Sequence, residues 1–152
     1  MFVIGERING MFVKVKKAIE ARDKSAIQKI ARRQLDAGAD ALDINVGPVR
    51  GSALDNMCWM IEAVEEVTDA PICIDTPKFD VMNEALHACS NPTIINSTKA
   101  IEEELDRYVP LMSLKGRKGH DTLALWLSVF CDIPPSQLRH VLRRDLLRLP
   151  EL

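Results

Sequence analysis

The 152-residue chain has few of the sequence features that mark membrane, exported or nucleic-acid-binding proteins. It contains no uncharged run of about 18 apolar residues, so the sequence predicts no transmembrane helix. The apolar run at the N-terminus ends after four residues at Gly5, Glu6 and Arg7, which is too short for the core of a signal peptide. The formal net charge of −2 provides no electrostatic reason to bind nucleic acid or an anionic membrane.

Cysteine and histidine are also scarce and scattered. The cysteines are Cys58, Cys73, Cys89 and Cys131. They show no CxxC spacing and lie mostly in apolar stretches, which favours reduced, buried thiols over a disulfide framework or a zinc site. His87 and His140 lie in helical patterns without a metal-ligating partner at a suitable spacing. We therefore expect no metal site and a cytoplasmic location.

The chain does contain a regular alternation of strand and helix patterns. The expected strands are residues 1–4, 41–45, 71–76 and 93–97. The expected helices cover about 14–21, 23–37, 53–67, 79–89 and 101–111, with Gly38 as a C-terminal helix cap. Short strands alternating with amphipathic helices favour parallel β/α units joined by right-handed crossovers.

The composition changes after Leu114. Residues 115–152 hold seven basic and four acidic residues and open on KGRKGH. We expect a partial barrel over residues 1–114 and a divergent tail over residues 115–152. Within the tail, TLALWLSVF is compatible with a fifth buried strand or with a core helix, and an amphipathic helix is expected from Ser136 onward.

Polar residues end or follow each of the four strand patterns. They occur in the segments GERIN, DIN, CIDT and INST. The carboxyl ends of strands in parallel β/α folds share one rim, and ligands bind at that rim. We therefore expect one pocket to be formed by Glu6, Asn9, Asp43, Asn45, Asp75, Asn96 and Ser97.

An apolar run that ends on a carboxylate, as PICIDT does at Asp75, suggests an acid that faces a site. Carboxylates only accept hydrogen bonds, whereas carboxamides both donate and accept. An Asp beside an Asn therefore suits a 2-amino-4-oxo pterin ring, whose amino and N–H groups can bond Asp75 while Asn96 serves ring nitrogens or the carbonyl. The alternative is that these side chains only cap helices or pair with basic groups.

The four segments, in their order along residues 1–113, resemble the pterin-binding barrel of the methyltetrahydrofolate:corrinoid methyltransferases, which is also the folate domain of cobalamin-dependent methionine synthase. The resemblance rests on GERIN, DINVGP, CIDT and INST. Dihydropteroate synthases share the barrel, but they usually carry Asp-Ser-Phe and Ile-Gly-Gly-Glu-Ser motifs where this chain has INGMF and DINVGP. The resemblance therefore favours the methyltransferase branch.

This resemblance implies transfer of a methyl group from N5 of methyltetrahydrofolate to the cobalt of a corrinoid (cobalamin) carried by a partner protein. Asp75 and Asn96 match positions that grip the pterin, and Asp43 and Asn45 lie in the same pocket wall. The residue that activates N5 in the family is an Asn on a later strand without a counterpart here, so the catalytic residue stays unknown. Only Asp121 and Asp132 in the tail are candidates to replace it.

A complete eight-stranded barrel takes about 250 residues. The expected fold class is therefore α/β, a truncated pterin-binding TIM barrel of four to five parallel β/α units. A truncated gene, a piece of a longer enzyme and a natural half-barrel all fit this pattern. Because an open sheet leaves unpaired edges and apolar surface, we expect a homo-oligomer. The alternative functions are a non-catalytic pterin- or folate-binding module, a self-associating remnant and a dihydropteroate synthase-like enzyme.

Overall fold

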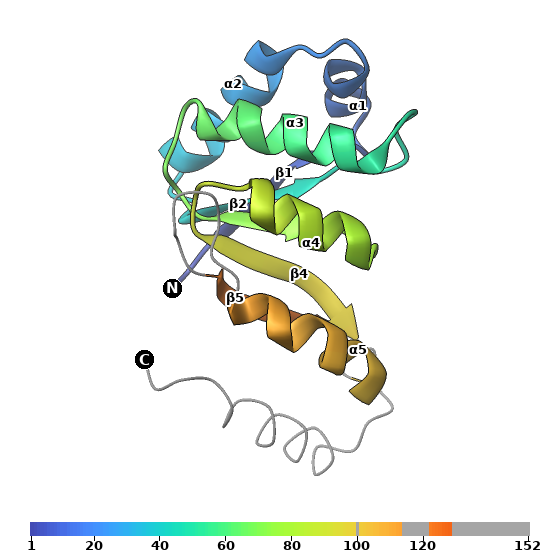
Figure 1. The fold of residues 1–152 in the computed structure, drawn as a ribbon. Coiled ribbons are helices and arrows are strands. Elements are labelled where there is room, and N and C mark those ends of the chain that lie inside the picture. The colour runs from blue at the N-terminus through green and yellow to red at the C-terminus, as the bar shows by residue number, and fades with distance from the viewer. Residues whose placement is uncertain (100, 114–121, 129–152) are drawn as a thin grey trace.

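Five parallel strands form one sheet in the computed structural model, which describes residues 1–99, 101–113 and 122–128 (Figure 1). The strands are β1 (Ile4–Asn9), β2 (Ala41–Asn45), β3 (Ile72–Asp75), β4 (Thr93–Lys99) and β5 (Thr122–Ser128). The helices are α1 (Val13–Glu20), α2 (Lys24–Asp36), α3 (Ala53–Glu65), α4 (Phe79–Ala88) and α5 (Glu102–Tyr108), and a 3₁₀ turn (Val109–Ser113) follows α5. Each strand lies beside the strand that precedes it in the chain.

Among the described residues, helices cover one face of the sheet and leave the other face without a helix. The main core joins the helices to one set of strand residues, Ile8, Leu42, Ile44, Ile72, Ile74 and Ile95. A smaller cluster of Ala41, Cys73 and Ile94, with Ile4 beside it, includes no helix residue. Strand order that follows chain order, with helices on one side, is the winding of a (β/α) barrel. The fold is therefore the expected α/β type, consistent with part of a pterin-binding TIM barrel.

Local signals place the helices where the pattern predicted them. The side chain of Asp23 accepts a hydrogen bond from the Ala26 N–H at 3.1 Å and starts α2. At the other end Gly38 has φ of +93°, its N–H donates to Leu35 O, and the Ala39 N–H donates to Gln34 O. This is the paired hydrogen-bond pattern of a glycine-capped helix end.

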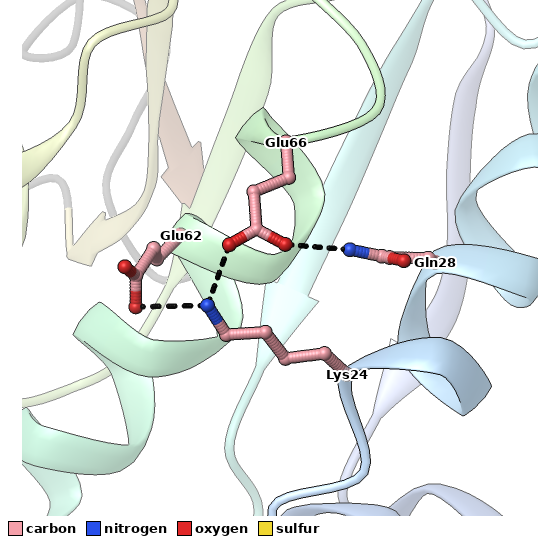
Figure 2. A network of polar contacts seen from close by, with 4 residues as sticks. All are labelled: Lys24, Gln28, Glu62 and Glu66. Atoms are coloured by element: carbon pink, nitrogen blue, oxygen red, sulfur yellow. Dashed lines mark hydrogen bonds and ion pairs between the residues drawn. The ribbon is translucent and has the colours of Figure 1, made fainter.

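Helices α2 and α3 are also joined by a polar contact on the protein surface. Figure 2 shows the Lys24 ammonium between Glu62 at 3.3 Å and Glu66 at 2.6 Å, with the Gln28 amide on the other oxygen of Glu66. The hydrogen bond to Glu66 is the main cause of a raised Lys24 pKa. The contact links two helices whose buried faces pack on the same sheet.

The first strand differs from the prediction. Residues 1–4 were expected to form it, with Gly5 as its end, but β1 runs from Ile4 to Asn9 and includes Gly5. The register with β2 shifts between Gly5 and Ile8. There Glu6 and Arg7 together lie opposite the single residue Asp43. A β-bulge of this kind tolerates polar residues inside a strand, and for that reason the alternation of apolar residues did not reveal it.

The fifth apolar run forms a strand, β5, which extends the sheet parallel to β4. The tail boundary, Asp121, Cys131, Asp132 and the helix expected from Ser136 lie outside the described residues. No helix in the described ranges is long and apolar enough to cross a membrane. Cys73 and Cys89 are buried, as expected for thiols of the interior, and Cys58 is half-buried.

Replacing Gly10 by Ala should destabilise the fold more than replacing Gly38. A Cβ at Gly10 would lie 1.8 Å from the Val46 carbonyl oxygen, so the loop must move. At Gly38 nothing lies within 4 Å of the added carbon, and only the cost of positive φ applies. Urea unfolding should give losses of ~3 kcal/mol for G10A and ~1 kcal/mol for G38A. Equal losses would show that the loops at Gly10 and Val46 do not have to meet.

Candidate functional site

Four polar residues form one row across the carboxyl ends of the strands. Asn9 pairs with Asn45, Asn45 with Asp75, and Asp75 with Asn96 in the register of β1 to β4. Residues opposite one another in a sheet present their side chains on the same face. Here that face is the one without helices, because the neighbouring positions Ile44, Ile74 and Ile95 belong to the helix-covered core.

Asn45 and Asp75 are joined directly. The Asn45 Oδ1 accepts from the Gly47 N–H at 2.7 Å, which fixes the orientation of the amide. Its Nδ2 therefore points to Asp75 and donates to Oδ2 at 2.5 Å. The second carboxylate oxygen of Asp75 has no hydrogen-bond partner among the described residues, so it is available to a ligand.

Asn96 and Asp43 form the second polar pair. The Asn96 Nδ2 donates to Asp43 Oδ1 at 2.9 Å, and this contact leaves the Asn96 carbonyl oxygen on the other side of the amide. Asp43 lies one layer below the row, opposite Cys73. Both residues line a small pocket of about 170 Å³ together with Ile4, Glu6 and Asn96.

The pocket perturbs the titration of its acid. Asp43 is only 3% exposed, and this burial raises its pKa from 3.8 to about 6, with repulsion from Asp75 and Glu6 adding to the shift. The hydrogen bonds from Asn96 and Cys73 oppose it. Burial also raises the pKa of the Cys73 thiol, which therefore stays protonated at neutral pH. Asp43 is thus an acid whose charge changes just below neutral pH.

Three of the predicted site residues, Glu6, Asn9 and Ser97, make none of the side-chain hydrogen bonds that join Asn45 to Asp75 and Asn96 to Asp43. Glu6 lies inside β1 rather than at its end, exposed at the edge of the pocket. Asn9 turns back on its own loop, where its Oδ1 accepts from the Met11 N–H at 2.9 Å. Ser97 is the extra residue where Asn96 and Thr98 pair with consecutive positions of β5, and the Asn96–Ser97 peptide bond is cis.

Two contributors to the site were not among the predicted residues. The Gly47 N–H orients Asn45, and the Cys73 thiol lies beside Asp43. Cys73 occupies the position two residues before Asp75, so the period of two along a strand was the signal that places both on one face. Gly47 has φ of +63° and was visible only as part of a glycine-containing turn.

The arrangement provides hydrogen-bond acceptors and donors in a defined pattern. Asp75 offers a carboxylate oxygen, and Asn96 offers a carbonyl oxygen because its amide nitrogen is engaged by Asp43. Adjacent acceptors of this kind suit a planar ligand edge that carries two or more N–H donors. The polar atoms that fix their orientation are protein groups, so the acceptors are preorganised before a ligand arrives.

Comparison with known proteins identifies the family of this chain. Residues 9–114 match the family described as pterin binding enzyme. The chain is 34% identical over 111 residues to the methylcorrinoid:tetrahydrofolate methyltransferase of Eubacterium limosum, covering 73% of this chain and 41% of that protein. It is 28% identical over 128 residues to the methionine synthase of Mycobacterium leprae (strain TN), covering 82% and 11%. The chain thus spans less than half of the length of either relative.

Replacing Asp43 by Asn should remove a pH-dependent part of the stability. With a folded pKa of about 6 and an unfolded pKa near 3.8, the folded state binds this proton more tightly. The resulting stability is fully present below pH ~3.8 and is lost as the pH rises through ~6. Relative to the Asn variant, the natural protein should lose ~3 kcal/mol of unfolding free energy between pH ~4 and ~7. Urea unfolding across this range tests it, and a difference that does not vary with pH would contradict it.

Proposed function

Because the chain belongs to the pterin binding enzyme family, we propose that it binds the pterin ring of methyltetrahydrofolate and takes part in methyl transfer between this folate and a corrinoid. The observation that carries the proposal is the register of β3 and β4, which puts Asp75 directly opposite Asn96. Two oriented acceptors then stand side by side at the carboxyl rim, where parallel β/α folds bind ligands.

The hydrogen-bonding pattern of a pterin supports this assignment. The ring carries an amino group and an adjacent N–H on one edge, and both need acceptors. Asp75 can take both, since one carboxylate oxygen is engaged only once by Asn45 and the other has no partner in the described part of the chain. Asn96 then faces the ring's remaining polar groups with an amide whose orientation Asp43 sets.

Asp43 has a positioning role in this proposal. It holds the Asn96 amide nitrogen and lies 3% exposed beneath the row. While Asp43 is ionised it only accepts hydrogen bonds, so Asn96 must donate to it and present its oxygen to the ligand. The pKa of about 6 means that this orientation is enforced at neutral pH.

The names of the relatives support methyl transfer between a folate and a corrinoid as the class of reaction. One relative is named for methylcorrinoid and tetrahydrofolate, and the other is a methionine synthase. A methyl group leaves N5 of a folate only if that nitrogen gains positive character, since a neutral tertiary amine is a poor leaving group. The row of Asp75 and Asn96 would bind and orient the pterin, while the corrinoid would be held by a separate protein at the same rim.

Methyltetrahydrofolate should bind saturably in calorimetric titration, and the variants Asp75→Asn and Asn96→Ala should each weaken it. Loss of one buried hydrogen-bonding group costs ~1–3 kcal/mol, or about 5- to 150-fold in affinity. Asp69→Asn is the matched control, because this exposed acid lies in the loop before β3 and removes the same charge away from the rim.

Light scattering on the same samples would determine whether the protein self-associates, as we propose for a sheet with unpaired edges. Equal binding by all three variants would contradict the proposed site, and absence of binding by a folded sample would contradict the function. Pterin binding without methyl transfer to a Co(I) corrinoid would reduce the function to binding alone.

A further inference from the structure

A second cavity lies on the opposite side of β1, among β1, α1 and α2, where Figure 1 shows these two helices at one end of the helix layer. Its volume is about 560 Å³, within the range of small-molecule sites. Its lining consists of Arg7, Phe12, Val13, Lys14, Val15, Ile30, Arg33, Gln34 and Ala37. None of these residues belongs to the polar row or to the pocket around Asp43.

The charge of this cavity is of one sign. Arg7, Lys14 and Arg33 line it, and none of the described residues that line it is acidic. Within residues 1–99, 101–113 and 122–128, none of the three is part of an ion pair, whereas Lys24 on the same layer of helices has two. Three cations around one apolar cavity favour an anionic ligand, because the described part of the chain supplies no counter-charge there.

The bulge in β1 places Arg7 in this cavity. Glu6 and Arg7 together face the single residue Asp43, and their side chains go to opposite faces of the sheet. The Arg7 guanidinium lies 4.2 Å from the centre of the Phe12 ring, so a flat cation and an aromatic face meet at the cavity wall. Such a pair can hold a planar ligand by stacking on either member.

Gln34 lies in the same wall of the cavity, where a backbone hydrogen bond holds its side chain. Its Oε1 accepts from the Arg7 N–H at 2.7 Å, which settles which end of the amide is nitrogen. It fits against β1 only because residue 5 is glycine, since a Cβ there would lie 2.8 Å from Oε1. Its Nε2 is buried without a hydrogen-bond partner among the described residues, so the wall has a donor and no matching acceptor.

Helix α1 adds to the positive potential. Its first three residues, Val13, Lys14 and Val15, line the cavity, and Phe12 at the N-cap supplies no side-chain hydrogen bond. The first turn contains no acidic residue. Uncapped N–H groups and the helix dipole both favour negative charge at this end.

From these contacts we propose that the cavity binds a small aromatic carboxylate, with its ring among Phe12, Val13 and Ile30 and its carboxylate near Arg33 and Lys14. The apolar part of the lining disfavours a ligand that is only an anion, such as phosphate. The cationic rim disfavours a neutral ring. This site is independent of the pterin site, since the two lie on opposite faces of the sheet.

The test uses 2-naphthoate as the probe and 2-naphthamide as its neutral counterpart, titrated into the full chain and followed by fluorescence and calorimetry. We expect saturable binding of naphthoate, at least ten-fold weaker binding of naphthamide, and at least five-fold weaker naphthoate binding by Arg33→Gln. Arg32→Gln is the matched control, because Arg32 is an exposed arginine of the same helix that does not line the cavity. Its affinity should stay within two-fold, and circular dichroism would confirm that both variants are folded.

The Asp75→Asn variant should bind naphthoate within two-fold of the natural protein. A five-fold or larger loss in Asp75→Asn would overturn the proposal of a separate site, and so would equal binding of the acid and the amide or equal weakening by the two arginine variants. Because folate binding is measured separately with Asp75→Asn, the two proposals can fail independently.

Discussion

The register of the parallel sheet is the constraint on which the rest of the site depends. Asn9, Asn45, Asp75 and Asn96 come from four strands, and they meet because each strand pairs with its neighbour at the same height. A slip of one residue in any pairing would exchange the faces, sending a carboxylate into the core of Ile44 and Ile74 and an isoleucine to the rim. The apolar, helix-covered face therefore stabilises the observed register, since the cost of burying a charge opposes a slip by one residue.

Most of the fold could be predicted because its physical signals are local. The strands around Asp43, Cys73 and Ile94 are short runs rich in apolar, mostly β-branched residues, and Asp23 and Gly38 mark the ends of a helix by capping. The first strand could not be placed correctly, because its bulge puts Glu6 and Arg7 inside a strand and the apolar alternation stops there. That irregularity depends on pairing with β2, which the local sequence does not encode.

The residues of the candidate site could be predicted from the sequence, but the hydrogen bonds between them could not. The expectation that the carboxyl ends of parallel strands share one rim was enough to group Asp75 with Asn96, and the motif order indicated the family. The pairing of Asn45 with Asp75 and of Asn96 with Asp43 depends on which residues face one another and on a backbone donor at Gly47. The raised pKa of Asp43 likewise follows from burial by other strands, a property of the assembled sheet rather than of the DIN segment.

The order of strands in the sheet also sets the length of chain that each contact of the site closes. Asn45 and Asp75 are 30 residues apart in the chain, whereas Asp43 and Asn96 are separated by 53. Because each strand pairs with the strand that precedes it in the chain, each pairing closes a loop of one β/α unit. The entropic cost of closing a loop rises only slowly with its length. The rim contact between β2 and β3 can therefore form before β4 is added. The contact between Asp43 and Asn96 needs β4 as well, so the burial of this acid depends on a longer stretch of chain than the contact between Asn45 and Asp75 does.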